Sequence, residues 1–378
     1  MKKIVALLLV LPFLILPLVG SAAGPGTKAA ATLLMEKETG TILFEENSHQ
    51  KLEPASVTKV MTMLLIMEAL DEGRIKKEDM VTTSTNAAGM GGSQVFLKEG
   101  EQMSVHDMLK AIAVASGNDA SVAMAEHIAG SESGFVDLMN SKATQLGMAD
   151  THFVNCTGLP AEDHVTSAHD IALMSRELIL KHPGIQEYTT IWMDTLRNGQ
   201  FQLANTNKLI YYYNGATGLK TGSTDSALYC LSACAQRDGM ELIAVILGSP
   251  TSADRFETAK ALLNYGFATY TLLDVKPSEA VPPVLVNLGE VSSVLPVPAK
   301  SSRILLEKTK SNKVTTSISV TDSVDAPVEK GQKLGEMVVY VDDQPYETIP
   351  LISEGAIPHL TFFQIFKDFM SILFLCQS

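Results

Sequence analysis

The sequence predicts a mixed α/β (α+β) protein in which a larger helix-containing domain precedes a small β-rich domain. Three observations predict this class: an apolar helical segment at 56–70, a strand-rich stretch at 209–248, and a change to proline-rich, alternating sequence after Phe267. The 378 residues are enough for two domains of about 100–200 residues each.

Residues 1–23 have the features of a cleavable export signal. Two lysines precede an apolar run from Ile4 to Val19, and small residues follow as far as Ala23. The run is shorter than the ~20 residues that a membrane-spanning helix needs, which favours cleavage after Ala23 over an uncleaved anchor. We therefore expect a signal peptide and an exported protein.

The first domain is expected to begin with a β-hairpin and to contain a buried helix. Residues 30–44 are apolar on both sides of a Glu38-Thr39-Gly40 turn. Residues 56–70 are apolar on nearly every side of a helix, as in a helix at the centre of a domain. Ser104 caps a second predicted helix that extends to Ala115, and Asn118-Asp119 can cap the next one.

The stretch 209–248 contains a second hairpin. Strands are predicted at 226–235 and 241–247, around an Arg237-Asp238-Gly239 turn. Lys220-Thr221-Gly222 lies on or just before the preceding strand, and the bare glycine allows the backbone of a substrate to approach closely.

The rest of the chain predicts a β-rich domain at 274–358 and a helix within 359–378. Short alternating runs occur at 314–320 and 336–341, with turns at Lys330-Gly331 and Asp342-Asp343. From His359 to Leu375 a narrow polar stripe faces a broad apolar surface that includes five phenylalanines (Phe362, Phe363, Phe366, Phe369 and Phe374). We expect this helix to lie in a membrane surface, and packing on its own domain or in a dimer is the alternative.

Charge and residue spacing argue against three features: nucleic-acid binding, a disulfide between Cys230 and Cys234, and a metal site. The formal net charge of −13 does not suit a nucleic-acid-binding protein, because phosphate contacts need clustered lysine and arginine. Cys230 and Cys234 fall ~13 Å apart in a predicted strand, too far for a disulfide, so buried free thiols are expected. The cysteines and histidines show no metal-ligand spacing, and we expect neither a metal nor a cofactor.

Three short motifs supply the groups for acyl transfer through a serine ester. In Ser56-Val57-Thr58-Lys59 a hydroxyl and an amine lie one helical turn apart, and burial favours the neutral amine that can take the serine proton. Ser116-Gly117-Asn118 adds a hydroxyl and an amide, and Lys220-Thr221-Gly222 adds a cation. Alone, Ser-Gly-Asn is a helix connector and Lys-Thr-Gly a strand-end turn, so their occurrence together in this order indicates the chemistry.

With these motifs the chain resembles the serine D-alanyl-D-alanine carboxypeptidases, the low-molecular-mass penicillin-binding proteins. The likeness extends from about Ala30 to the terminal helix and includes Thr151-His152-Phe153-Val154-Asn155 and Asn205-Thr206-Asn207-Lys208-Leu209. It implies a β-lactamase/DD-peptidase-like domain at 24–273, with an antiparallel sheet flanked by helices. The chain departs from many relatives at Thr157, where they carry histidine.

The resemblance implies a role for each motif residue. Ser56 would attack the penultimate D-alanine of a peptidoglycan stem pentapeptide, with Lys59 as base, and Ser116 would pass a proton to the leaving amine. The backbone N–H groups of Ser56 and Ser223 would form the oxyanion hole, and β-lactams would acylate Ser56 as mimics of the D-Ala-D-Ala end. Substrate binding is implied for Asn118, Lys220, Thr221, Gly222, Ser223, Thr224 and Arg255.

Two other functions remain as alternatives. A β-lactamase with these motifs uses a glutamate on a loop to activate water, and the sequence around Glu162 does not match that loop. A non-catalytic penicillin-binding sensor or wall-binding protein would be expected to lose catalytic residues or to carry a signalling domain. The sequence thus favours an exported DD-carboxypeptidase on the extracytoplasmic face of the cell membrane, and it does not indicate an oligomeric state.

Overall fold

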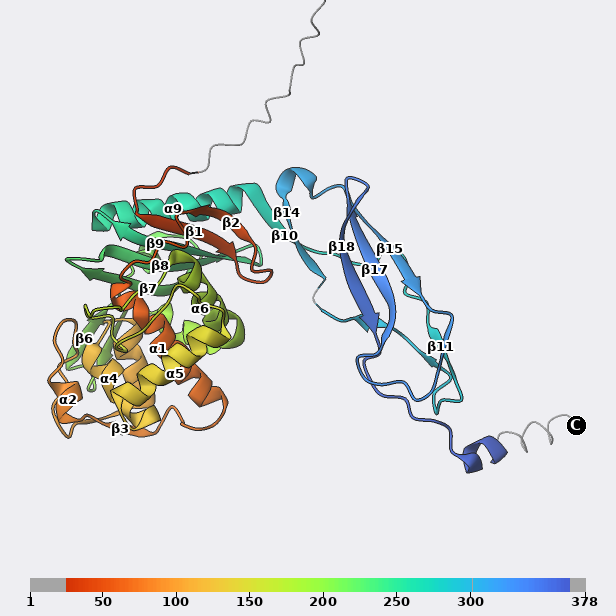
Figure 1. The fold of residues 1–378 in the computed structure, drawn as a ribbon, viewed down its shortest axis with the longest axis horizontal. Coiled ribbons are helices and arrows are strands. Elements are labelled where there is room, and N and C mark those ends of the chain that lie inside the picture. Colours follow the sequence, from red (N-terminus) through yellow and green to blue (C-terminus); the bar gives the residue numbers. More distant parts are fainter. Residues whose placement is uncertain (1–24, 301, 368–378) are drawn as a thin grey trace, which may run out of the picture.

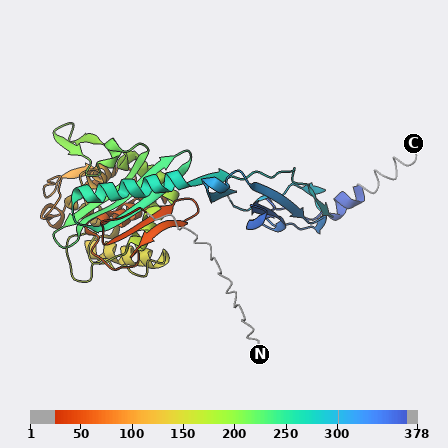
Figure 2. The same ribbon diagram turned by 90° about the horizontal axis from the view of Figure 1, so that it is seen from above.

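The computed structural model describes residues 25–300 and 302–367, which form a larger and a smaller body arranged along one long axis (Figures 1 and 2). The predicted signal peptide and the part of the predicted terminal helix beyond residue 367 lie outside the described residues.

A five-stranded antiparallel sheet forms the centre of the larger body. Its order is β2-β1-β9-β8-β7. The strands are β1 (Ala31–Glu36), β2 (Ile42–Glu46), β7 (Ala216–Thr224), β8 (Leu228–Arg237) and β9 (Met240–Ser249). The central strands are buried along most of their length, as expected for a sheet covered on both faces. Both predicted hairpins are confirmed, and β7 lies at an edge of the sheet.

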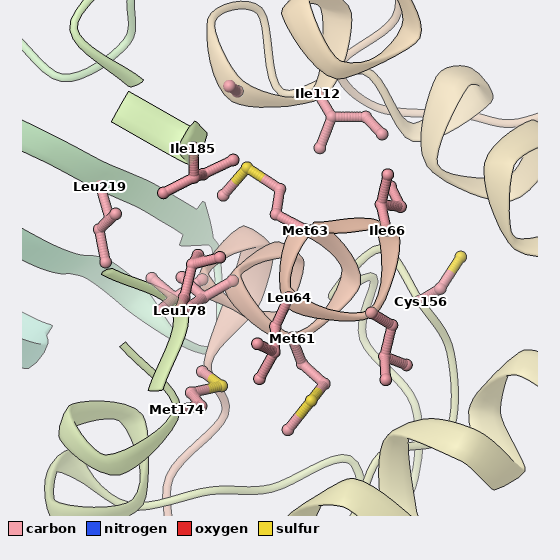
Figure 3. Packing of buried hydrophobic residues seen from close by; sticks show 14 of the residues in the cluster. Met61, Met63, Leu64, Ile66, Ile112, Cys156, Met174, Leu178, Ile185 and Leu219 are labelled. Atoms are coloured by element: carbon pink, nitrogen blue, oxygen red, sulfur yellow. The ribbon is translucent and has the colours of Figure 1, made fainter. Parts of the chain in front are cut away.

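Helices cover the two faces of this sheet. α9 (Ser252–Thr269) packs on one face, over β8 and β9 (Figure 1). On the other face α6 (Ala168–Lys181) packs on β1 and β9, and α1 (Lys59–Asp71) packs on α6. Figure 3 shows apolar side chains of α1 directed to different sides, among them Met61, Met63 and Ile66. The predicted burial of this helix is confirmed.

The other elements of the larger body connect and surround this core. They are η1 (Ala55–Thr58), β3 (Met80–Thr82), α2 (Thr85–Ala88), β4 (Gln102–Ser104), α3 (Val105–Ala113), α4 (Asn118–Ala129), α5 (Glu132–Gln145), η2 (Pro183–Ile185), α7 (Gln186–Thr189), β5 (Met193–Leu196), β6 (Phe201–Ala204) and α8 (Leu209–Tyr212).

Two local predictions were wrong. Residues 209–212 form the short helix α8, so the strand-rich stretch begins at β7. Gly117, not Asn118 or Asp119, occupies the N-cap position of α4. The carboxylate of Asp119 instead accepts hydrogen bonds from Val95 N and Leu97 N, so it holds a neighbouring loop. The Ser104 cap is confirmed, because its Oγ accepts from Asp107 N at 3.1 Å.

The smaller body consists of strands, as predicted. β10 (Tyr270–Asp274) follows α9 directly and pairs with β14 (Arg303–Glu307), while Leu305 packs into the core between α9 and the large sheet. The other strands are β11 (Val284–Asn287), β12 (Ser293–Val294), β13 (Val297–Pro298), β15 (Val314–Val320), β16 (Ser323–Asp325), β17 (Lys333–Val341) and β18 (Gln344–Ile352), with the turn η3 (Lys308–Lys310). They form sheets of order β13-β18-β17-β15 and β12-β11-β16.

The chain leaves the smaller body through a segment fixed to the β11–β12 turn. His359 bridges Gly289, and Leu360 N donates to Leu288 O at 2.7 Å. The terminal helix therefore begins at Phe362, not at His359 as predicted. Across residues 25–300 and 302–367, none of the helices combines the length and the apolar character that crossing a membrane requires.

The cysteines within the described residues are buried and unpaired. Cys156, Cys230 and Cys234 are all free thiols, which confirms the prediction for Cys230 and Cys234. Burial raises the pKa of Cys156 and Cys234 well above the usual value and that of Cys230 to about 11. Cys376 lies outside the described residues.

Candidate active site

Ser56 lies in η1, the turn that leads into α1. In a 3-10 turn side chains three residues apart align closely, and Lys59 Nζ lies 3.1 Å from Ser56 Oγ. The turn starts at Ala55, which has a φ of +47° in the left-handed region. The predicted hydroxyl–amine pair is therefore formed, at the junction of η1 and α1.

Lys59 is fully buried, and its amine contacts three oxygen atoms. Besides Ser56 Oγ, Nζ lies 2.6 Å from both Asn118 Oδ1 and Thr157 O. Burial lowers the pKa of Lys59 to about 7. The two carbonyl oxygens can only accept, so they take both protons of the neutral amine and leave its lone pair directed at Ser56 Oγ. This arrangement suits a general base.

The second motif lies between α3 and α4. Asn118 is fixed on both sides of its amide, because Oδ1 accepts from Lys59 and Nδ2 donates to Gly91 O at 2.7 Å. Ser116 has a φ of +63°, and its buried Oγ has no hydrogen-bond partner among the described residues. A buried hydroxyl without a partner is costly, so it is available to a group that enters the site.

Lys220 and Thr221 occupy the edge strand β7. Lys220 is buried, and its Nζ donates to Thr221 O at 2.9 Å. Burial, with repulsion from Lys59 and Arg255, lowers the pKa of Lys220 well below its usual value. Thr221 Oγ1 donates to Thr206 Oγ1 at 2.6 Å, and Thr206 N donates to Val114 O. Thr206 therefore joins the strand of the third motif to the segment that leads to the second.

Gly222 is required by a contact within the protein. A Cβ at this position would lie 2.8 Å from Ser56 N and 2.9 Å from Pro54 O. The missing side chain thus makes room for the turn that carries Ser56, and the approach of a substrate backbone to Gly222 stays a prediction.

The next two residues of β7, Ser223 and Thr224, differ in their surroundings. Ser223 is exposed at the strand edge. Thr224 Oγ1 accepts from Ala227 N at 2.9 Å, so its hydroxyl takes part in the turn between β7 and β8.

Arg255 reaches β7 from α9 and stabilises the strand. Its Nη1 donates to Gly222 O at 3.1 Å and to Cys230 O at 3.2 Å, and its guanidinium lies over Phe256. Burial lowers the pKa of Arg255 to about 10, which leaves it cationic at neutral pH.

The sequence did not predict one of the oxygens that contact the Lys59 amine, because this oxygen belongs to the backbone. The oxygen at Thr157 that contacts Lys59 belongs to the backbone, while the Thr157 hydroxyl donates to Asn155 Oδ1 at 3.0 Å within the loop. Asn155 Oδ1 also accepts from Gly158 N. The departure from many relatives at residue 157 was visible in the sequence, but the use of its carbonyl was not.

Sequence reasoning also missed a buried histidine beside the catalytic turn. His164 Nε2 lies 2.8 Å from Thr58 Oγ1, and Thr58 Oγ1 donates to Ala55 O. Among the described residues, no group of three His, Cys, Asp or Glu side chains is arranged to hold a metal ion.

Comparison with known proteins gives two family matches that together span most of the chain. Residues 19–251 match the family described as D-alanyl-D-alanine carboxypeptidase, peptidase S11. Residues 274–359 match the family described as penicillin-binding protein 5, C-terminal domain.

Individual relatives agree with these matches. The chain is 43% identical to the D-alanyl-D-alanine carboxypeptidase DacF of Bacillus subtilis, over 91% of this chain and 89% of the relative. The structure of penicillin binding protein 5 from Haemophilus influenzae superposes with a TM-score of 0.77 and 31% identity, over 89% of this chain and 99% of that one. The ampicillin-bound penicillin-binding protein D2 of Listeria monocytogenes gives a TM-score of 0.56 and 31% identity, over 64% and 98%.

Proposed function

The chain belongs to the peptidase S11 family of D-alanyl-D-alanine carboxypeptidases, and from this membership we propose how its own residues carry out the reaction. The protein is a serine-type D-Ala-D-Ala carboxypeptidase that acts on the stem peptides of peptidoglycan. The family match favours this activity over the β-lactamase and sensor alternatives.

The neutral amine of Lys59 starts the reaction by taking the proton of Ser56 Oγ. The contact of 3.1 Å between these atoms, with both other contacts of the amine made to pure acceptors, is the observation that carries this proposal. Ser56 Oγ then attacks the carbonyl carbon of the penultimate D-alanine, and the N–H groups of Ser56 and Ser223 stabilise the oxyanion. Ser116 relays the proton held by Lys59 to the leaving amine, so Lys59 and Ser116 regain their starting forms. The terminal D-alanine departs, and water hydrolyses the Ser56 ester.

The substrate is proposed to bind in extended form along the free edge of β7. An edge strand offers unpaired backbone groups to an added peptide strand. Asn118 binds the amide of the substrate, and Thr221 and Thr224 help to bind its terminal carboxylate. An entering carboxylate offsets the burial that disfavours the charged form of Lys220, so that residue becomes the local cation. Arg255 adds to this positive field from the opposite side of the strand.

A direct test uses D-alanine release from diacetyl-Lys-D-Ala-D-Ala with and without penicillin. We expect release that penicillin blocks, and both release and covalent labelling lost in Ser56→Ala but kept in Ser133→Ala, a serine on the exposed side of α5. Retained labelling of Ser56→Ala would contradict Ser56 as nucleophile. Rapid penicillin hydrolysis without release would favour a β-lactamase, and stable labelling without release a sensor.

We also propose that the protein is exported and rests on the membrane surface through its C-terminal end. Phe362, Phe363 and Phe366 are 75%, 81% and 53% exposed, which argues against packing on their own domain. The neighbouring β11–β12 turn adds exposed Leu288 and Val291, and the backbone bonds at 288–290 keep this turn beside the helix.

Sedimentation with phosphatidylcholine vesicles tests this location. We expect the mature protein to bind and Phe363→Glu/Phe366→Glu to lose binding, with Leu138→Glu, an exposed leucine on α5, as control. Equal binding of the double variant and the parent would contradict the proposal.

A further inference from the structure

We infer that His164 is a positioning residue for the reaction: acting through Thr58, it fixes the peptide plane that carries the N–H of Ser56. The inference deepens the proposed function and rests on it, because this N–H is one of the two groups proposed to stabilise the oxyanion.

The hydrogen bonds around His164 define which nitrogen carries its proton. Val154 N donates to His164 Nδ1 at 3.0 Å, so Nδ1 is unprotonated. The ring is buried, and burial with repulsion from His152 lowers the pKa of His164 to about 4, so the ring is neutral at pH 7. The proton is therefore on Nε2, which donates to Thr58 Oγ1 at 2.8 Å.

Thr58 transfers this constraint to the residue before the nucleophile. Because its oxygen accepts from His164, its own proton is free to bond Ala55 O, at 2.9 Å. Ala55 O and Ser56 N belong to one planar trans peptide, in which the carbonyl and the N–H point in opposite directions. A fixed Ala55 carbonyl therefore fixes the direction of the Ser56 N–H.

The turn needs such external contacts. Ala55 has a φ of +47°, a conformation that costs a non-glycine residue free energy unless its surroundings impose it. Gly158 packs so closely on Ala55 O that a Cβ there would lie 1.8 Å from it, while Gly222 packs on Ser56 N from the other side. The bond between Val154 and His164 closes a loop of residues 154–164. Through Gly158 this loop packs directly on the Ala55 carbonyl, and through Thr157 O it contacts Lys59.

Two substitutions separate the two sides of the imidazole. In His164→Gln the longer side chain can place an amide N–H where Nε2 lies, so it keeps the donor to Thr58 and loses the acceptor for Val154. In His164→Asn the shorter side chain can accept from Val154 but does not reach Thr58. Both variants remove the ring, so slower acylation in His164→Asn than in His164→Gln reports the loss of the bond to Thr58, and the reverse order reports the loss of the bond to Val154.

We expect the acylation rate with penicillin and kcat for D-alanine release to fall at least about tenfold in His164→Asn, with KM within about threefold, because the lost interaction acts in the transition state. His164→Gln stays within about threefold of the parent. His106→Asn, which removes a half-exposed histidine bonded to Tyr188 on α7, is the matched control and leaves the rate unchanged.

A double-mutant cycle with Thr58→Val tests the relay itself. If the two residues act in series, the double variant His164→Asn/Thr58→Val is no slower than the slower single variant. Additive losses, or a His164→Asn variant that acylates at the parent rate, overturn the inference. A parent protein that releases no D-alanine would instead refute the proposed function.

Discussion

The amine of Lys59 combines full burial with contacts to three oxygens, and its protonation state decides whether Ser56 can be activated. Burial alone would favour the neutral form, while the carbonyl oxygens of Asn118 and Thr157 determine where the lone pair points. Both conditions come from segments far from residue 59 in the sequence. They make two quantities depend on pH: the rate of acylation and the stability of the fold.

Acylation is expected to depend on a single group with a pKa near 7. Below that value Lys59 is protonated and the penicillin acylation rate falls about tenfold per pH unit, whereas above it the rate reaches a plateau. Stopped-flow labelling between pH 5 and 9 measures this profile. A rate that is flat from pH 5.5 to 8.5 would contradict Lys59 as the base.

Lys59 also makes stability increase with pH. Its pKa of about 7 in the folded protein lies below the value of ~10.4 in the unfolded chain, so the unfolded chain binds more protons between these values. We expect the free energy of unfolding of the parent, relative to Lys59→Met, to rise from pH 7 to pH 9.5. Urea denaturation at both pH values measures this difference, to which Lys220 adds in the same direction, because Lys59 is one of the charges that lower its pKa. A constant difference would show that Lys59 keeps an ordinary pKa.

Ser116→Ala should separate activity from stability. The buried Oγ has no partner among the described residues, so its removal loses no internal hydrogen bond and relieves a cost of about 1–3 kcal/mol. We expect unchanged or higher stability in urea, with D-alanine release reduced on the order of 100-fold because proton transfer to the leaving amine is lost. A marked loss of stability would reveal a structural role instead.

At the scale of elements, the site depends on how closely β7 approaches the turn that carries Ser56. Gly222→Ala would place a Cβ 2.8 Å from Ser56 N and 2.9 Å from Pro54 O, both of them backbone atoms that cannot move aside cheaply. We expect acylation to fall at least tenfold and stability to fall by about 1–3 kcal/mol. Thermal unfolding and penicillin labelling measure the two effects.

The control for this substitution is Gly355→Ala. This glycine lies in the smaller body, has no atom within 4 Å of a Cβ, and does not have a left-handed φ. An equal effect of both substitutions would mean that the loss comes from the glycine-to-alanine change itself and not from the contact with Ser56.

The elements differ in how well the sequence predicted them. The hairpins and the helix at 56–70 follow from local alternation, turn residues and apolar content, which the chain carries within a short segment. The acceptor at Thr157 and the relay from His164 join residues about a hundred positions apart through backbone atoms and a buried ring. No local pattern encodes such contacts. Residues 209–212 fell within the stretch predicted to be strand-rich but form α8, because a run of four apolar and aromatic residues is too short to show either period.

At the scale of the molecule, we expect the larger body to react with penicillin without the smaller body, but to need the smaller body and the terminal helix for membrane binding. The relative from Listeria monocytogenes matches this chain over only 64% of its length while 98% of that relative is covered. A protein that ends at Asp274 should acylate with penicillin within about threefold of the full chain, because no site residue lies beyond Arg255.

The same truncated protein is expected to melt at a lower temperature and to lose vesicle binding. It lacks β14, the partner of β10, and the contact of Leu305 with the core under α9. Differential scanning calorimetry and sedimentation measure these losses. A truncated protein that is folded but fails to acylate would show that the smaller body shapes the site.

The buried thiols are expected to react with oxidants much more readily in the unfolded chain than in the folded protein. In the native state Cys156, Cys230 and Cys234 are buried, and their raised pKa values keep these three thiols in the protonated, unreactive form. Once the chain opens, the same sulfurs return to a pKa near ~8.5 and can couple with one another or with other molecules. In the oxidising compartment that the proposed export implies, each unfolding event is then a chance of permanent loss, so the rate of unfolding contributes to the lifetime of the enzyme beside its equilibrium stability.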